Sequence, residues 1–511
     1  MESFSQVFLE VWKRQQARLA CKWDTVDLGY EYEPPRPEYQ ATAKDKRRHP
    51  ITREFEPYIP ARSRLQNIIA SMSGVTFLIS LAIAIIIAVI IFKATMVATF
   101  YSWHLPLVGT AIDILGGPLV TSMTGSGINA ISIITLEKLY GYIAWWLTEK
   151  EYPRTMSDFE MSYTYKMYIF QFVNYYALLF YLAFVQPTVQ VMATPLLTSF
   201  NDMCDPVGCS FFVTTQLLVI LVVKQAWNNV VEIFVPKLMH WWKTRKHAAA
   251  TEENIYARYE RDFDLPPPPT LSLLPEYLEM VIQYGTVVLF GAAFPLSPLF
   301  ALINNVVEIR IDAYKFVVEV RRIMPYRGFD IGTWQTILDF VTRLAILTNG
   351  LMLAFTTDII DRFVYQSWIS PSGDMTGYIS FILAKFNTSD WNDPALAYDK
   401  KIGHVEICRY RGYYNDNDLP NEYELSENWW MAMLAKFLFV FIFQNIVLWI
   451  QEVIQYTIPD VPDDVELHIQ RNRYISKMAA YHFEKEGATP GGGDSKPQIR
   501  VDPPLTTVKE E

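Results

Sequence analysis

The sequence predicts an all-α protein that crosses a lipid bilayer several times. Of its 511 residues, 51% are hydrophobic and 15% are aromatic. Several apolar runs approach or exceed the roughly 20 residues that a helix needs to span a bilayer. The loops between these runs alternate between segments rich in Lys and Arg and segments without them, as the positive-inside rule requires. We therefore expect a polytopic helical membrane protein with about eight transmembrane helices.

The eight expected crossings follow directly from the apolar runs. They lie near 68–92, 119–146, 166–186, 210–235, 274–292, 298–320, 332–358 and 429–456. Around them we expect the end of a truncated membrane helix at 1–12, a cytosolic linker at 13–64, a transmembrane domain at 65–461 and a cytosolic tail at 462–511 that is largely disordered at its end.

The placement of basic residues predicts the orientation. Lys and Arg are absent from the loops at about 94–118 and 188–209, so these loops should face outside and both chain ends the cytosol. The loop 361–428 is then extracellular, and Asn387 within it begins a glycosylation sequon. Cys204 and Cys209 also fall on the outer side, where they would form a disulfide or remain two free thiols.

The net charge argues against nucleic acid as a partner, and the cysteines argue against a zinc site. The formal net charge is −10, and no long basic stripe suggests nucleic-acid binding. The four cysteines show neither a CxxC motif nor a Cys/His pattern of a zinc site.

Acidic residues recur inside three consecutive expected crossings. They form pairs one helical turn apart: Asn228 with Glu232, Glu276 with Glu279, and Glu308 with Asp312, with Asn304 one turn before the last pair. Each spacing places a pair on one face of a helix. The expected topology brings all three pairs to a similar depth, toward the cytosolic side.

Five carboxylates at one depth in a membrane require compensation, because each costs several kcal/mol to desolvate. Lys224 and Arg310 are too few cations, and Arg310 points roughly 160–200° away from its acidic neighbours. Calcium takes 6–8 oxygen ligands, so Ca²⁺ is the ion that this set predicts. The alternative is that these acids sit at helix ends and reach the cytosolic headgroups.

Long stretches of the chain resemble the anoctamin family. The resemblance rests on KQAWNNVVEIFVPK, PEYLEMVIQYGTVVLF, FPLSPLFALINNVVEIRIDAYKF, DIGTWQTILDF, FQFVNYYALLFYLAF, HVEICRYRGY and YTIPDVP, in collinear order. Anoctamins are ten-helix dimers that act as calcium-activated chloride channels or phospholipid scramblases. The resemblance implies that our eight crossings match the third to tenth family helices, in a partial chain that lacks the N-terminal cytosolic domain and first two membrane helices.

The resemblance also implies roles for particular residues. The two-calcium site would comprise Asn228, Glu232, Glu276, Glu279, Glu308 and Asp312, with Asn304 as a neighbour. A further calcium site would map onto Glu10 and Asp460, although Gln455 stands where the family has another acid. Lys224 would line the conduction groove, or else offset the acidic cluster, and Val223 replaces a glycine hinge found in many channel-type members.

Three function classes follow. The leading class is a calcium-activated transport protein for chloride or phospholipids, a homodimer if full length, in the plasma membrane or alternatively in an intracellular membrane. The second is an intramembrane metal-dependent enzyme, against which the sequence shows no HExxH or paired catalytic motif. The third is a non-conducting interaction or tethering protein of the same family.

Overall fold

The computed structural model describes residues 2–26, 33–48, 53–102, 117–186, 209–232, 265–268, 271–325, 330–387, 406–415 and 424–487, apart from a few positions within them and with scattered positions between them. The long helices are α1 (Glu2–Lys22), α3 (Ala61–Ser102), α5 (Gly117–Lys150), α6 (Met156–Phe180), α8 (Cys209–Leu218), α11 (Leu274–Leu289), α12 (Ser297–Tyr314), α13 (Thr333–Leu351), α16 (Glu427–Thr457) and α17 (Asp463–Gly487).

Short π-helical segments follow several of these helices. They are η2 (Tyr181–Val185), η3 (Val219–Lys224), η4 (Lys315–Glu319), η5 (Met352–Thr356) and η6 (Tyr365–Ile369). Such segments widen the backbone spiral locally and occur frequently at functional sites. Two of them, η3 and η4, lie next to predicted calcium ligands.

The remaining elements are short. They are the helices α2 (Pro37–Thr42), α14 (Ile359–Val364) and α15 (Tyr378–Ile382), and the strands β1 (Asp45–Arg48), β2 (Phe55–Tyr58), β3 (Leu383–Asn387), β4 (Tyr398–Asp399), β5 (Gly403–His404) and β6 (Ile407–Arg411). The strands form three antiparallel pairs, β1 with β2, β3 with β6 and β4 with β5.

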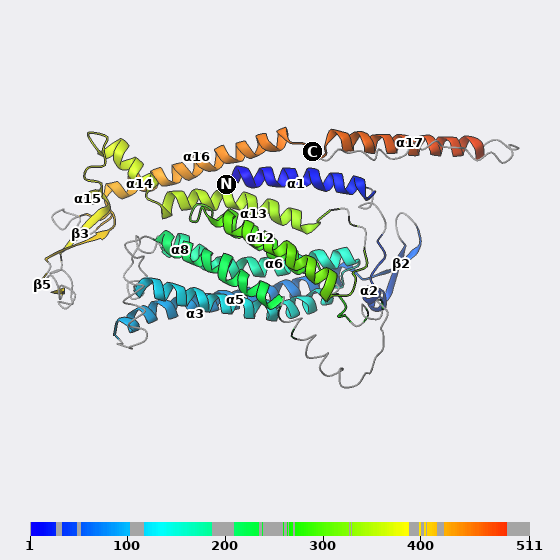
Figure 1. The fold of residues 1–511 in the computed structure, drawn as a ribbon, viewed down its shortest axis with the longest axis horizontal. Helices are drawn as coiled ribbons and strands as arrows, with labels where there is room; N and C mark the ends of the chain where they lie inside the picture. The colour runs from blue at the N-terminus through cyan, green and yellow to red at the C-terminus, as the bar shows by residue number, and fades with distance from the viewer. Residues whose placement is uncertain are drawn as a thin grey trace.

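The long helices run side by side along one direction (Figure 1). α16 and α1 lie along one side of this bundle, α3 and α5 along the other, and α6, α8, α12 and α13 lie between them. The β1–β2 hairpin and the β3–β6 pair lie at opposite ends of the bundle. The described strands of the expected linker 13–64 and of the expected loop 361–428 therefore lie at opposite ends of the bundle. Which side of the membrane each end faces stays a prediction.

The local sequence explains where several helices begin. The Thr155 hydroxyl accepts a hydrogen bond of 3.1 Å from the Asp158 amide and so caps α6. Pro275 and Pro298 stand in the first turns of α11 and α12, where a missing N–H costs nothing. These starts fix the register of the two helices that carry most of the predicted ligands.

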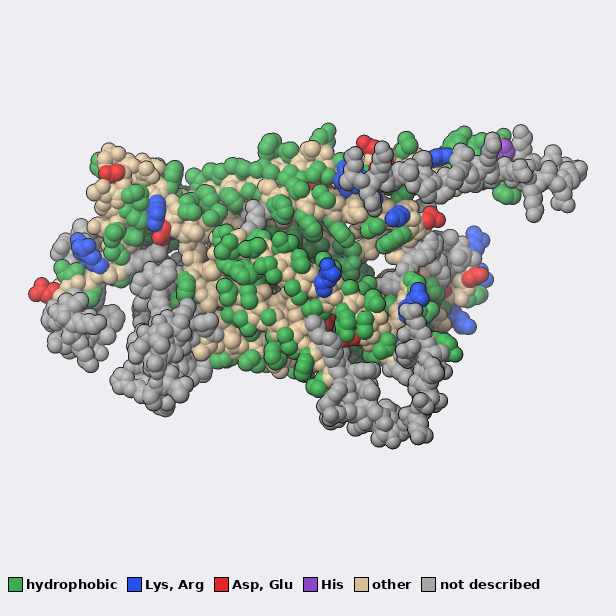
Figure 2. Space-filling model, viewed as in Figure 1, with side chains coloured by type: hydrophobic (Ala, Val, Ile, Leu, Met, Phe, Trp, Pro, Cys, Tyr) green, Lys and Arg blue, Asp and Glu red, His purple; other side chains and the backbone are tan. Residues whose placement is uncertain are grey.

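The interior is apolar and aromatic. Tyr176, Phe290 and Val341, from α6, the end of α11 and α13, are fully buried in one hydrophobic cluster. Hydrophobic side chains also cover the middle of the face shown in Figure 2, and most of the charged ones lie toward the two ends. An apolar belt between charged ends is the surface of a protein whose middle faces lipid.

Among the described residues, five helical segments are long and apolar enough to span a membrane. They are Ala61–Ile91, Met156–Val185, Ser210–Glu232, Thr333–Thr356 and Glu427–Thr457, and each overlaps an expected crossing. The other three expected crossings are also helical, as α5, α11 and α12 with η4. α11 has only 16 residues, fewer than a helix needs to span a bilayer by itself. α12 carries charged residues, which lower its mean hydropathy. That these segments cross the membrane stays a prediction.

One expected boundary is wrong. The first helix does not end near residue 12 but continues to Lys22, inside the segment expected to be a linker. The apolar run ends where the mostly polar residues KRQQARLACK begin. Most of these residues are good helix formers, so the helix continues through them. The linker also contains the β1–β2 hairpin. The tail is helical as far as Gly487, and its expected disordered end lies outside the described residues.

Candidate calcium site

Two helical segments bring three of the predicted calcium ligands close together. Carboxylate oxygens of Glu232, Glu308 and Asp312 all lie within 4.8 Å of one another. Glu232 is the last residue of the described helical stretch 225–232, which continues from η3, and the other two belong to α12. Glu232 thus lies in one acidic cluster with two residues that follow it by 76 and 80 positions in the sequence.

Lys315 joins Glu276 to this cluster. Its ammonium forms ion pairs with Glu232 and, at 2.5 Å, with Glu276 Oε1 of α11. The sequence reasoning missed this lysine when it counted Arg310 and Lys224 as the available cations. The signal was present, because Lys315 follows Glu308 by seven residues and Asp312 by three, and so lies on nearly the same helical face. The acids are partly compensated by the chain itself.

Glu279 contacts the amide side chains of the helical residues 225–232. Gln225 donates a hydrogen bond to Glu279 Oε1, and the Asn228 amide lies 3.5 Å from the same oxygen. Gln225 was not among the predicted site residues, although it lies three residues before Asn228 on the same helix. The Asn228 carboxamide oxygen remains available as a neutral ligand.

Glu308 is the most buried carboxylate of the cluster, with 3% of its surface exposed. Oriented with its nitrogen toward the acid, the Asn229 amide donates to Glu308 Oε2 at 3.0 Å. In the part of the chain that the structure describes, Glu308 Oε1 and Asp312 Oδ1 are buried without a hydrogen-bond partner. Buried carboxylate oxygens without partners are costly, and a cation is the ligand that satisfies them.

Asn304 lies beside the cluster, and its side chain contacts the amides of Asn229 and Gln283. Its amide donates to Gln283 Oε1 at 2.8 Å, and Gln283 donates to Asn305 at 2.5 Å. This amide chain links α11 to α12 one turn from Glu308. The structure therefore places Asn304 as a neighbour that holds two ligand-bearing helices together.

The donor set fits calcium. Five carboxylates and one amide supply oxygen ligands only, which hard divalent cations prefer, and their flexible side chains suit the variable coordination of Ca²⁺. Zinc would favour histidine and cysteine, which are absent from these motifs. Glu232, Glu276, Glu279, Glu308 and Asp312, with Asn228, are thus the residues that would hold the ion.

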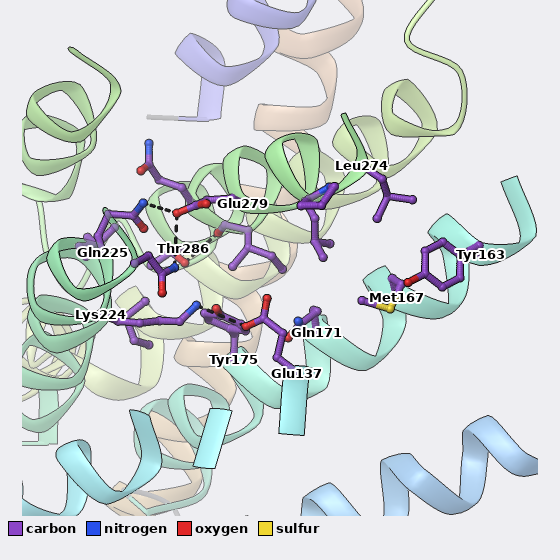
Figure 3. A pocket seen from close by; sticks show the side chains of 17 residues that line it. Glu137, Tyr163, Met167, Gln171, Tyr175, Lys224, Gln225, Leu274, Glu279 and Thr286 are labelled. Atoms are coloured by element: carbon purple, nitrogen blue, oxygen red, sulfur yellow. Dashed lines mark hydrogen bonds and ion pairs between the residues drawn. The ribbon is translucent and has the colours of Figure 1, made fainter. Parts of the chain in front are cut away.

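A cavity of about 220 Å³ adjoins the cluster, between α5, α6, η3 and α11. Figure 3 shows Lys224 reaching across it toward Glu137 and Tyr175. The Lys224 ammonium lies 3.8 Å from Glu137 Oε2 and 4.0 Å from the centre of the Tyr175 ring. Lys224 lines this cavity and pairs with Glu137 of α5, and it also interacts electrostatically with Glu279 of the candidate calcium site. Both interpretations of Lys224, as a cavity residue and as a charge that offsets the acids, therefore stay predictions.

The second predicted metal site is filled by a lysine. Lys13 lies 3.0 Å from Glu10 Oε1 and 3.7 Å from Asp460 Oδ1, so it bridges the two acids. Glu10 is fully buried, and its other oxygen lacks a hydrogen-bond partner among the described residues. Gln455, in place of a third acid, is exposed. Glu10 and Asp460 therefore share one internal cation, Lys13, and a metal ion between them stays a prediction.

Two further predicted sites lie at the edge of the described chain. Asn387 is the last residue of β3, paired with Ile407, and its sequon partners lie outside the described residues. The predicted Cys204–Cys209 disulfide also falls outside them, because only the backbone of Cys209 is described.

Comparison with known proteins assigns the family. The model of the family described as "Anoctamin: Calcium-activated chloride channel" matches residues 1–472. The chain is 38% identical to human Anoctamin-5 over 488 residues, which is 94% of this chain and 53% of that protein. It is 35% identical to mouse Anoctamin-4 over 506 residues, covering 95% and 52%. It is 34% identical to human Anoctamin-7 over 507 residues, covering 98% and 52%.

The chain spans about half the length of the curated relatives it matches. Its family match, however, covers nearly all of its described helices. Together with the apolar helices, this match identifies a multi-pass membrane protein that belongs to the anoctamin family.

Proposed function

We propose that this chain is the membrane part of a calcium-activated transport protein that passes chloride, scrambles phospholipids, or does both. The observation that carries the proposal is the convergence of Glu232, Glu308 and Asp312 from separate segments, with two buried oxygens that lack partners. The family description, calcium-activated chloride channel, supports the same ion and the same class of activity.

The site is built so that one wall can move relative to the others. Glu276 and Glu279 belong to α11, and Glu308 and Asp312 to α12, whereas Glu232 belongs to the helical residues 225–232 that follow η3. A π-helical turn lacks the regular hydrogen bonding of an α-helix, so η3 can serve as the hinge that the absent glycine at Val223 would otherwise provide. Residues 225–232 are the segment that we expect to move.

Charge repulsion opposes the approach of that segment. Two carboxylates about 5 Å apart repel by roughly 3 kcal/mol at an effective dielectric near 20. Lys315 offsets part of this repulsion, and Glu308 and Asp312 keep uncompensated oxygens. Bound calcium would supply the remaining positive charge and draw Glu232 toward α11 and α12. The equilibrium shifts only by the difference in ion affinity between the two arrangements, which a site shared by separate segments provides.

The same movement would change the adjoining cavity. Lys224 precedes Asn228 by one turn, and both line this cavity, so displacement of the segment displaces the Lys224–Glu137 ion pair. A lysine freed from Glu137 would present positive charge along a path inside the membrane. That charge suits chloride or the phosphate of a lipid headgroup.

The assembly and location of the protein are part of the proposal. We propose that the protein is a homodimer with both chain ends in the cytosol. It would lie in the plasma membrane or, alternatively, in an intracellular membrane. Membrane lipids and small anions such as chloride are the partners. The alternative is a non-conducting tether of the same family, and the following experiment distinguishes the two.

The test is flux through vesicles that contain only this protein. Chloride efflux and the movement of a fluorescent phospholipid are recorded in the same vesicles across a calcium titration. Glu308→Gln should raise the calcium concentration for half-maximal activity more than tenfold, because a lost ligand costs more than about 1.4 kcal/mol. Glu452→Gln, which removes an exposed acid from α16, is the matched control and should change it little. If the folded protein shows neither chloride efflux nor phospholipid movement at any calcium concentration, the alternative of a non-conducting tether is favoured.

A further inference from the structure

Lys315 is paired with two of the five acids of the candidate calcium site. Its ammonium contacts Glu232 and Glu276 together, although these acids come from different helical segments. The lysine side chain is 29% exposed and the two acids 18% and 15%, so the contact is largely shielded from water. A shielded ion pair is stronger than one on the surface, where its median contribution is about 0–1 kcal/mol.

The backbone directs Lys315 to this position. It is the first residue of η4, directly after the α12 turns that carry Glu308 and Asp312. On an α-helix, positions seven apart differ by only about 20° around the axis, so Lys315 follows the face of Glu308. Arg310 of the same helix is exposed and lies on the opposite side. One cation of α12 and η4 therefore faces the acids and the other faces away.

An ammonium and a calcium ion would use the same oxygens. Calcium binds carboxylate oxygens at about 2.3–2.6 Å. The Lys315 ammonium already lies 2.5 Å from Glu276 Oε1 and is also paired with Glu232. Two cations cannot contact one oxygen at these distances without strong mutual repulsion. Occupation by calcium requires the ammonium to leave Glu232 and Glu276.

We propose that Lys315 is a built-in competitor for the calcium site and sets the calcium concentration at which the site fills. In the ion-free protein its ammonium holds Glu232 against Glu276 and satisfies two of the five carboxylates. The side chain is long and partly exposed, so the displaced ammonium can reach water. This inference rests on the proposed function, since it assigns a role to a residue within the same site.

Direct calcium binding to purified protein tests the proposal without any flux measurement. Calcium is titrated by calorimetry, and terbium, which replaces calcium at oxygen sites, by its luminescence. Lys315→Met keeps the apolar stem and removes the charge, and it should lower the calcium concentration for half-saturation at least tenfold. Lys315→Arg keeps a cation in reach of the acids and should stay within threefold of the parent protein.

Arg310→Met is the matched control, because it removes one positive charge from the same helix at an exposed position that faces away from the acids. It should change calcium binding less than threefold. Equal shifts in Arg310→Met and Lys315→Met would mean that only net charge matters, which overturns the proposal. Unchanged or weaker calcium binding in folded Lys315→Met would also overturn it.

Chemical restoration of the amine at position 315 tests the proposal independently of Lys315→Met. Lys315→Cys should bind calcium tightly, and treatment with bromoethylamine, which rebuilds a lysine-length amine on the thiol, should weaken binding again. Treated parent protein controls for modification of the native cysteines. If no charge-removing variant folds, Lys315 is an obligatory structural partner and the proposal is wrong. If the parent protein and Glu308→Gln both fail to bind calcium, the proposed function fails instead.

Discussion

The Tyr176 hydroxyl donates a hydrogen bond of 2.7 Å to the Ile282 carbonyl, in the middle of the helix that carries Glu276 and Glu279. Tyr176 is completely buried in α6. At the end of α11, the Asn349 amide donates to the Val288 carbonyl at 2.7 Å. Side chains from α6 and α13 thus hold α11 at two levels. We infer that α11 is the fixed wall of the candidate calcium site.

Gly285→Ala tests this fixed wall. A Cβ at position 285 would overlap the Tyr176 hydroxyl, and the buried ring has little room to move. Overpacking of this kind costs about 1–3 kcal/mol. We expect a lower melting temperature and a higher calcium concentration for half-maximal activity, measured by thermal unfolding in detergent and by vesicle flux.

The compensating change is Tyr176→Phe. It removes the overlapping oxygen and leaves the nearest ring carbon, Cζ, at 3.1 Å from the new Cβ. The double variant should therefore be more stable than the sum of the two single effects predicts, since residues in contact are not additive. Strict additivity would show that the Gly285–Tyr176 contact does not position α11.

A buried ion pair at the other end of the bundle gives a prediction about stability. Lys436 of α16 lies 3.0 Å from Asp361 of α14, and the two side chains are 9% and 3% exposed. Removing one partner leaves an uncompensated buried charge, which costs about 3–5 kcal/mol. Lys436→Met should lower the melting temperature strongly, and Lys436→Met with Asp361→Leu should recover most of it. A single variant as stable as the parent would contradict this interpretation.

The sequence predicted the acids of the site better than their counterions. Glu232, Glu276, Glu308 and the other candidate ligands can be recognised in the sequence, because an acid within an apolar helical run is costly and rare. Lys315 does not, because a lysine at the polar end of a crossing is ordinary. Its role depends on the direction of a flexible side chain at the start of η4, which helical periodicity alone does not determine.

The same reasoning explains the other differences. The end of the first helix was placed too early because hydropathy reports where a chain leaves an apolar environment, and helix formation continues through polar residues such as those before Lys22. The Lys224–Glu137 pair joins residues 87 positions apart. A contact of that kind follows from packing between α5 and η3 and leaves no local pattern in the sequence.

The predicted orientation can be tested with tags and glycans. A glycan should attach to Asn387, because the loop 361–428 is expected to face outside, and loss of a mass shift in Asn387→Gln would confirm the position. A tag at the C-terminus should be labelled only after cells are permeabilised. Labelling of this tag on intact cells would show that the orientation or the number of crossings is wrong.

The last prediction concerns the charge that remains after Lys315 has paired with Glu232 and Glu276. Glu279, Glu308 and Asp312 still repel one another, and the Asn228 amide lies 3.5 Å from Glu279. Asn228→Lys would place a second ammonium among these acids without removing a carboxylate. An effective dielectric near 20 makes each such contact worth a few kcal/mol.

If charge cancellation moves residues 225–232, then Asn228→Lys should show measurable chloride or lipid flux at zero calcium. It should also respond more weakly to calcium, because the amide ligand is lost, and its voltage dependence should change, because the new charge sits partly within the membrane field. Asn228→Gln, which keeps an amide and adds no charge, is the control and should stay silent without calcium. A folded Asn228→Lys protein that is equally silent would mean that calcium acts through specific ligand geometry, since added positive charge alone would then be insufficient to move the segment.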